Sequence, residues 1–261
     1  MKAEKSFLAR ATSKYRSVFA RRKAAAISAV IFGAAVSGTA AVRGVSVAPP
    51  ALDSCGDALC VIAFGDSLMA SSDLPPDDGF TRGLEKKLLA DGYRVRVINA
   101  SVAGDTSAHG LERLDAAVGA HADLAIVEFG ANDLLKGVEM SVLHQNLGKI
   151  VARFQAEGVR VLLAGFHVID APMIPHYLEL NAVYPEVAAE SGVELHPNFV
   201  RGMTGEHGPL PSCMGVTNHP TALGVAKIVE DVAPFVEREL RLVKRARNDP
   251  ARLSTAPAPQ E

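Results

Sequence analysis

The sequence predicts a single α/β domain built on a five-stranded parallel sheet over residues 58–247. Three observations predict it. Short apolar runs alternate along the chain with longer segments of helical periodicity. The apolar runs are continuous, as in strands that are buried on both faces. Each run ends in Gly, Asn or Asp, which are typical of the turns that follow strands.

The strands are expected at residues 60–64, 94–99, 124–129, 159–166 and 193–195, and the helices at residues 80–91, 109–119, 141–157, 177–191 and 222–246. In the third helix, Leu143, Leu147 and Ile150 fall on one face, and Gly158 is a typical C-terminal stop. Because parallel strands are joined by right-handed crossovers, their carboxyl ends share one edge of the sheet. That edge is where ligands bind in such sheets.

The first 42 residues differ from the rest of the chain. Residues 1–23 hold eight basic residues and one acid, and residues 24–42 carry no charge. This pattern is typical of a secretory signal, which predicts a periplasmic or secreted protein. An N-terminal membrane helix that anchors the protein to the inner membrane is the alternative, since an uncharged run of this length can span a bilayer. Residues 43–57 are expected to be a linker and residues 248–261 a disordered tail.

The charge of the chain is unevenly distributed. The 261 residues carry 27 basic and 29 acidic side chains, a formal net charge of -2. Without residues 1–42 the remainder holds 19 basic and 28 acidic residues and a formal charge of -9. An acidic surface argues against nucleic acid or anionic lipid as a partner, and no stable membrane partner is expected once a signal is removed.

Two of the three cysteines lie close together. Cys55 and Cys60 bracket a short loop just before the first expected strand. In an oxidising compartment they can form a disulfide, and two unpaired thiols are the alternative. Cys213 is then a free thiol or a small buried apolar residue.

Polar residues follow the expected strands where each strand ends. Ser67 follows the first strand, Gly104 the second and Asn132 the third, and His219 lies just before the last helix. A hydroxyl is a weak nucleophile that needs a base within hydrogen-bond reach, and histidine titrates near neutral pH. Attack on an acyl carbonyl creates an oxyanion. The backbone N–H groups of Ser67 and Gly104 and the Asn132 amide can stabilise it. The four residues together predict a serine hydrolase.

The segments around these residues resemble the SGNH, or GDSL-type, hydrolases, and within them the bacterial thioesterase I/lysophospholipase L1-like arylesterases. The resemblance rests on GDSL at 65–68, NASVAGDTSAHG at 99–110, FGANDLLKG at 129–137 and NHPTALG at 218–224. It implies a three-layer α/β/α flavodoxin-like fold and hydrolysis of small acyl esters or thioesters through an acyl-enzyme, without metal or cofactor. It implies the same roles for Ser67, Gly104, Asn132 and His219 as the chemistry does.

One position departs from the family pattern. Members carry an Asp three residues before the histidine that acts as base, and here that position is Val216. A carboxylate there would orient His219 and stabilise its charged form. We expect a Ser-His dyad whose ring is oriented by a backbone carbonyl or by Asn218. Two alternatives are an acid such as Glu206 reaching in from the preceding loop, and a catalytically impaired module that binds an acyl ligand.

Other acidic residues are expected to have structural roles. Asp66 and Asp133 flank predicted site residues and should brace loops by hydrogen bonds. Asp73, Asp77 and Asp78 are interpreted as a solvated acidic loop, because they lack the His or Cys neighbours of a metal site.

The substrate pocket is expected along an apolar run after the fourth strand. The candidate substrate-binding residues are Phe166, His167, Ile169, Met173 and Ile174, which suit an acyl chain, and core packing is the alternative. A carbohydrate O-acetylesterase is the competing enzyme class. The chain has no Trp and only four Tyr, which leaves few aromatic faces for a sugar.

Overall fold

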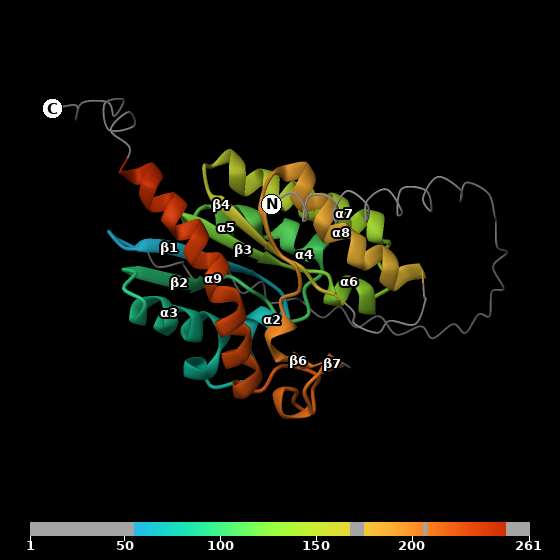
Figure 1. Ribbon diagram of the computed structural model, residues 1–261. Coiled ribbons are helices and arrows are strands. Elements are labelled where there is room, and N and C mark those ends of the chain that lie inside the picture. Colours follow the sequence, from blue (N-terminus) through green and yellow to red (C-terminus); the bar gives the residue numbers. More distant parts are fainter. Residues whose placement is uncertain (1–54, 168–174, 206–207, 249–261) are drawn as a thin grey trace, which may run out of the picture. The chain divides into compact units, whose positions relative to one another are not determined.

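The predicted five-stranded parallel sheet is present in the computed structural model, with strand order β2-β1-β3-β4-β5 (Figure 1). The structure describes residues 55–167, 175–205 and 208–248. The expected signal or membrane segment, most of the expected linker and nearly all of the expected tail lie outside these residues.

The strands lie close to their predicted positions. They are β1 (Leu59–Gly65), β2 (Val95–Asn99), β3 (Leu124–Glu128), β4 (Arg160–Ala164) and β5 (Glu194–His196). All pair in parallel, with Ile62 of β1 beside Ile98 on one side and Ala125 on the other. Every residue of β1 and β3 is buried, which explains why their sequences are continuously apolar. A short antiparallel pair, β6 (Thr204–Gly205) and β7 (Gly208–Pro209), was not predicted.

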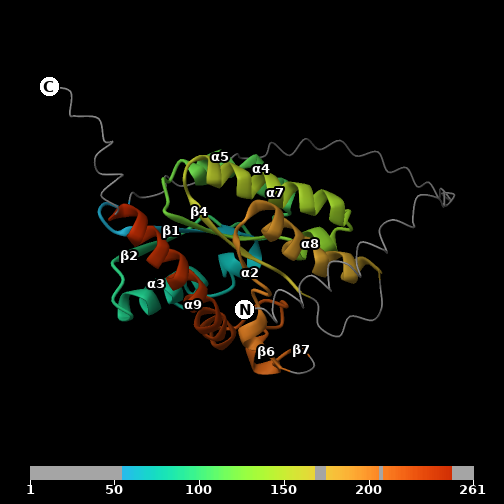
Figure 2. The ribbon, with the colours of Figure 1, turned by 45° about the horizontal axis from the view of Figure 1, so that its top comes forward.

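Two long helices cover one face of the sheet, as Figure 2 shows. They are α3 (Phe80–Ala90) and α9 (Ala222–Arg247), which pack together against the strands. Gly83 permits their close approach, since a Cβ there would lie 3.2 Å from the Val229 side chain. The short helix α2 (Ser67–Ala70) follows β1 directly, and α3 is preceded by the 3-10 helix η1 (Pro76–Asp78).

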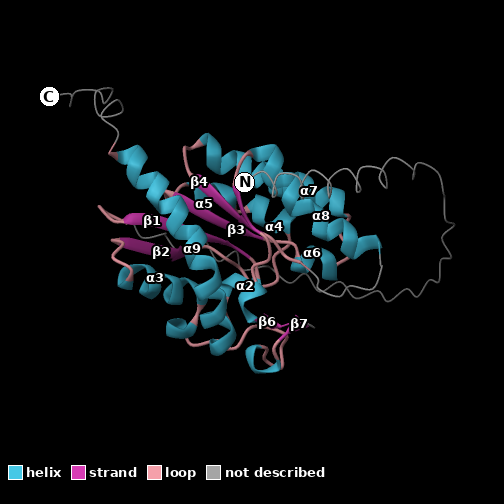
Figure 3. Ribbon diagram, viewed as in Figure 1, coloured by secondary structure: helices cyan, strands magenta, loops and turns pink. Residues whose placement is uncertain are grey.

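The opposite face is covered by α4 (Ser107–Glu112), α5 (Leu114–Val118), α7 (Met140–Ala156) and α8 (Pro175–Ser191) (Figure 3). The prediction of one helix at residues 109–119 was wrong. The helix begins earlier because Thr106 caps it, and it breaks at Arg113, whose side chain turns to the strand ends. Helix α6 (Ala131–Leu135) follows β3, and η2 (Arg201–Met203) and η3 (Pro211–Cys213) precede α9.

The strand order places a crevice at the carboxyl edge of the sheet. The chain runs from β1 outward to β2 and then returns to β3 on the other side of β1. The loops after β1 and β3 therefore diverge to opposite faces, which is the topological switch point where open α/β sheets bind ligands. The predicted flavodoxin-like α/β/α fold is confirmed.

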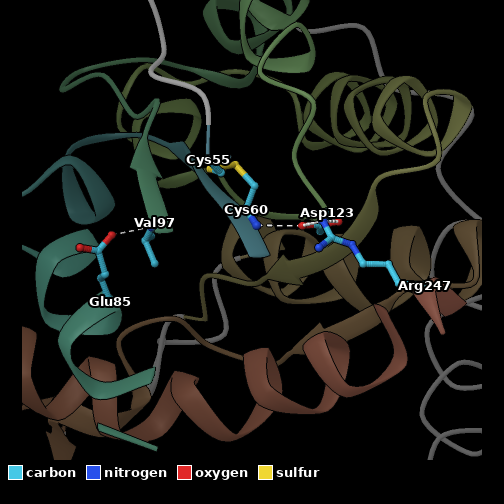
Figure 4. The surroundings of a disulfide bond; sticks show 6 residues. All are labelled: Cys55, Cys60, Glu85, Val97, Asp123 and Arg247. Carbon is cyan, nitrogen blue, oxygen red and sulfur yellow. Dashed lines mark hydrogen bonds and ion pairs between the residues drawn. A yellow bond between two sulfur atoms is a disulfide. The ribbon is translucent and has the colours of Figure 1, made fainter. Parts of the chain in front are cut away.

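The amino-terminal edge of the sheet carries a disulfide. Cys55 and Cys60 are bonded, as predicted, and the Cys60 backbone N–H donates to Asp123 at 2.8 Å (Figure 4). Arg247, at the end of α9, donates to both Asp123 carboxylate oxygens at 2.5 and 2.7 Å. The start of β1 and the end of α9 are thus joined through one carboxylate. Cys213 is a free, buried cysteine.

Figure 4 also shows one side-chain contact to the edge strand β2. The Val97 N–H on the edge strand β2 donates to the Glu85 carboxylate of α3 at 2.8 Å. This side chain occupies a backbone donor that another strand could otherwise pair with.

Within the part of the chain that the structure describes, there is no helix with the length and apolar character needed to cross a membrane.

Candidate active site

Ser67 and His219 line one cavity at the carboxyl edge of the sheet. The empty space there measures about 270 Å³, which includes open solvent. Its lining comprises Ser67, Ser71, Ser72, Asp73, Leu74, Ala103, His219 and Pro220. These residues come from the segments that follow β1 and β2 and from the loop before α9. The fold therefore brings together the predicted nucleophile and the predicted base, which are far apart in the sequence.

Ser67 is the first residue of α2, directly after the buried Asp66. The Asp66 carboxylate caps this helix by accepting from the Leu68 N–H at 3.0 Å. Its other oxygen accepts from the Asn132 side-chain amide at 3.1 Å. The predicted bracing role of Asp66 is confirmed, because one carboxylate connects the loop of Ser67 to the loop of Asn132.

Gly104 lies in the loop after β2 with φ +84°. No heavy atom lies within 4 Å of the position that a Cβ would take, so the backbone conformation, and not crowding, requires glycine there. The Gly104 carbonyl accepts from Lys136 at 2.8 Å, which ties this loop to the end of α6.

Arg113 binds the loop that carries Gly104, a role that was not predicted. Its guanidinium donates to Asp105 at 2.6 Å, to the Gly65 carbonyl at 3.0 Å and to the Ala100 carbonyl. The group also lies over the Phe64 ring at 4.4 Å. One partly buried guanidinium therefore holds the ends of β1 and β2 and Asp105, the residue that follows Gly104.

Asn132 is the second residue of α6, whose start depends on Gly130. Gly130 has φ +134°, and a Cβ there would lie 2.0 Å from the Tyr184 hydroxyl oxygen. That hydroxyl donates to the Phe129 carbonyl at 2.9 Å. The start of α6, and with it the position of Asn132, therefore depends on the close packing of Gly130 against the buried Tyr184.

Asp133 fastens α6 to α4. Its carboxylate accepts from the Ser107 N–H at 2.9 Å and from the Ser107 hydroxyl at 2.6 Å. The Asn146 amide of α7 donates to the same hydroxyl at 3.0 Å. All three side chains are buried, so the predicted bracing role of Asp133 is confirmed.

A buried acid lies beneath these loops at the end of β3. Neither carboxyl oxygen of Glu128 has a hydrogen-bond partner. Burial, reinforced by the nearby charge of Asp66, raises the pKa of Glu128 well above its usual range. Burial also raises the pKa of Asp66 to about 6, against the lowering effect of its hydrogen bonds from Leu68 and Asn132. Both carboxyl groups therefore release their protons at higher pH than exposed acids do.

The loop that carries His219 is a tight turn. The Asn218 N–H donates to the Gly215 carbonyl at 3.1 Å, and the Gly215 N–H donates to the His219 carbonyl at 2.8 Å. Asn218 adopts φ +60°, a conformation that Asn tolerates better than most residues. The Val216 side chain, at the position where the family pattern has Asp, is fully exposed to solvent.

The carboxylate that contacts the His219 ring belongs to Asp73. Its Oδ2 lies 2.6 Å from His219 Nδ1 and accepts from the Thr217 hydroxyl at 2.7 Å. Asp73 is exposed, as interpreted from the sequence, but the view that it has no histidine neighbour was wrong. The contact to the ring comes from Asp73, where a carbonyl or Asn218 was expected. Glu206, the other acid considered, lies outside the described residues.

Two of the five expected substrate-binding residues lie in the part of the chain that the structure describes. Phe166 is half-buried and packs against the apolar clusters on both faces of the sheet, in line with the core-packing alternative. The His167 N–H donates to the Asn198 side chain at 3.3 Å. Neither residue is among the described residues that line the cavity of Ser67 and His219. Ile169, Met173 and Ile174 lie outside the described residues.

Comparison with known proteins identifies a matching family and relatives that are named as esterases. A model of the GDSL-like lipase/acylhydrolase family matches residues 63–227. The esterase TesA of Pseudomonas aeruginosa is 36% identical over 179 residues, which span 68% of this chain and 87% of that protein. An arylesterase of Vibrio mimicus is 33% identical over 146 residues, spanning 54% of this chain and 70% of that protein. A crystal structure of TesA matches with a TM-score of 0.64 at 33% identity, covering 69% of this chain and 99% of that chain.

Proposed function

The chain belongs to the GDSL-like lipase/acylhydrolase family and is a hydrolase that acts on ester bonds, and on that premise we propose that it works as a serine esterase through an acyl-enzyme intermediate. The substrates are small acyl esters or thioesters. The observation that carries the proposal is the cavity that Ser67 and His219 line together, beside the loop of Gly104.

In the first half of the reaction, the Ser67 hydroxyl attacks the acyl carbonyl and His219 takes the hydroxyl proton. The oxyanion that forms is stabilised by the N–H groups of Ser67 and Gly104 and by the Asn132 amide. The Asn132 amide carries two N–H bonds, and only one is needed for the Asp66 carboxylate. The other remains for the oxyanion. His219 then gives its proton to the leaving alcohol or thiol.

In the second half, water replaces the departed group. His219 takes a proton from the water as it attacks the acyl-enzyme, and the same three donors stabilise the second oxyanion. Collapse of that intermediate releases the carboxylic acid and returns the proton to Ser67. No step requires a metal or a cofactor.

We propose that the enzyme acts outside the cytoplasm, in the periplasm or after secretion. Two features support this location. Residues 1–42 have the pattern of an export signal. The bond between Cys55 and Cys60 is of a kind that persists in oxidising compartments. Retention at the inner membrane by an uncleaved N-terminal segment is the alternative.

The test compares hydrolysis of p-nitrophenyl acetate, butyrate and octanoate by the wild-type protein and by Ser67→Ala. Loss of the nucleophile should lower kcat by a factor on the order of 10³ or more. Ser72→Ala is the matched control, because Ser72 lines the same cavity and the proposed reaction assigns it no step. Its kcat/KM should stay within a few-fold of the wild type. A fluorophosphonate should add its phosphonyl group to Ser67, as peptide mass spectrometry would show.

Equal rates for the wild type and Ser67→Ala would refute the esterase mechanism. They would favour instead a module that binds an acyl ligand without hydrolysing it. Hydrolysis confined to acetylated sugars would favour the carbohydrate O-acetylesterase.

A further inference from the structure

We propose that Asp73 is the positioning residue of His219, and that it is supplied by the loop after the nucleophile and not by the segment before the histidine. This inference rests on the proposed function, in which His219 is the base. It replaces the expected Ser-His dyad with a triad whose acid follows the serine by six positions in the sequence.

The contact has the geometry that such a role requires. Asp73 Oδ2 lies 2.6 Å from His219 Nδ1, the nitrogen that does not face a nucleophile when Nε2 acts as the base. The same carboxylate oxygen accepts from the Thr217 hydroxyl at 2.7 Å, so a second residue of the histidine loop helps to hold it. The hydrogen bonds from Thr217 and His219 lower the pKa of Asp73.

The loop that carries Asp73 is anchored at both ends by one residue. Ser71 ends α2 in the left-handed conformation, φ +55°. Its carbonyl accepts from the Leu74 N–H at 3.1 Å, and its hydroxyl accepts from the Phe80 N–H at 3.1 Å. Leu74 is partly buried against the core. Asp73 therefore lies in a closed turn between a fixed helix end and an apolar anchor, and does not depend on a free loop for its position.

The histidine loop explains why the acid comes from elsewhere. The turn that joins Gly215 to Asn218 directs the Val216 side chain into solvent. The next residue, Thr217, faces Asp73 instead. A carboxylate at position 216 would thus lie on the solvent side of the turn, away from the ring.

The chemical role follows from the contact. A carboxylate at Nδ1 holds the proton on that nitrogen, which leaves Nε2 free to take the proton of Ser67. It also stabilises the imidazolium that forms during attack. Because the Asp73 side chain is 44% exposed, water weakens this stabilisation relative to a buried triad acid. We therefore expect its removal to lower kcat by a factor on the order of 10² rather than the 10⁴ found when a buried acid is lost.

The experiment compares Asp73→Asn with Asp78→Asn in the full-length protein. Asp78 is the matched control because it is an exposed acid of the same loop, in η1, and the substitution changes the charge equally. Asp73→Asn should lower kcat about a hundredfold with little change in KM, and Asp78→Asn should stay within twofold. Both variants should melt within a few degrees of the wild type, since both sites are exposed.

The split between kcat and KM distinguishes positioning from a structural role. A carboxylate that only orients His219 does not contribute to substrate binding, so Asp73→Asn should lower kcat and leave KM unchanged. Thr217→Val, which removes the second hydrogen bond to the carboxylate, should lower kcat several-fold, also with KM unchanged.

The outcomes separate this inference from the proposed function. If Ser67→Ala abolishes turnover while Asp73→Asn matches Asp78→Asn, the esterase stands and the assignment of Asp73 is overturned. A rise in KM that accounts for the whole loss of activity in Asp73→Asn would also overturn it. If Ser67→Ala has no effect, the proposed function itself fails.

Discussion

Replacement of Gly130 by Ala should destabilise the protein by about 4 kcal/mol, and the magnitude follows from two separate terms. The first is backbone strain, since φ +134° is a conformation that costs a non-glycine residue roughly 1–3 kcal/mol. The second is overpacking. The new Cβ would lie 2.0 Å from the Tyr184 hydroxyl oxygen, and displacement of a buried side chain costs about 1–3 kcal/mol.

The Tyr184→Phe background separates these terms. Removal of the hydroxyl leaves the Phe129 carbonyl without its 2.9 Å donor, which costs about 1–3 kcal/mol on its own. In that background Gly130→Ala no longer meets the hydroxyl, although the ring and the Leu143 side chain remain 3.3 Å away. The cost of the alanine should therefore fall to about 2 kcal/mol. The double-mutant cycle should show a coupling of roughly 2 kcal/mol.

The assay is urea unfolding followed by circular dichroism at neutral pH, with kcat measured on the same four proteins. Because Gly130 precedes the helix that carries Asn132, Gly130→Ala should also lower kcat. A cost of the alanine that is equal in both backgrounds, within about 0.5 kcal/mol, would refute the role of the hydroxyl contact. A cost below about 1 kcal/mol in the wild type would refute the backbone argument as well.

Four further predictions concern the loops and the disulfide. Because burial, together with a neighbouring carboxylate, raises the pKa of Glu128, the folded protein binds more protons than the unfolded chain, so its free energy of unfolding falls as pH rises above the ordinary pKa of a glutamate. Glu128→Gln should make that fall smaller in urea titrations, and an unchanged slope would contradict it. Arg113→Lys keeps the charge but loses the guanidinium hydrogen bonds to two carbonyls and a carboxylate, so the free energy of unfolding should fall by about 2 kcal/mol. The kcat should fall as well. A variant with the thermal stability of the wild type would contradict this. Val216→Asp should keep kcat/KM within about twofold of the wild-type value, because the side chain at this position is fully exposed. A larger rise would mean that the turn brings position 216 to the His219 ring. Replacing Cys55 and Cys60 by Ser should lower the free energy of unfolding by about 2 kcal/mol, the value for a disulfide that closes a short loop. The variant should keep its kcat, because the disulfide lies at the opposite edge of the sheet from Ser67. A loss of kcat in the folded variant would contradict this.

The fold was predictable because each strand is a continuous apolar run between helices of clear periodicity. The buried strands β1 and β3 carry this signal most strongly. The missed feature was the break at Arg113, where a helical pattern continues through a residue that leaves the helix to bind strand-end carbonyls. Periodicity records which residues face the core, and it does not record a side chain that satisfies distant backbone groups.

The segments of the candidate site were predictable because each lies next to a strand or helix with a clear pattern. Ser67, Gly104 and Asn132 lie in the segments that follow β1, β2 and β3, and His219 lies just before α9. Asp73 was missed because its partner lies 146 residues away and is reached through the shape of two loops. One signal was present in the sequence. Val216 stands at the position where the family pattern has an Asp, and the loop that follows Ser67 contains an acid, Asp73.

The disulfide edge has a practical consequence for attaching this enzyme to a surface. The described chain begins at Cys55, at the amino-terminal end of β1, whereas Ser67 follows the carboxyl end of the same strand. A strand of this length spans about 20 Å. The covalent bond to Cys60 fixes the point at which the chain enters the sheet, so a tether fused ahead of Cys55 would pull on that point first. Fusion partners, display anchors or resins attached there should leave the entrance to the cavity unobstructed. The carboxyl end of α9, which Arg247 joins to Asp123, offers a second attachment point at the amino-terminal edge of the sheet.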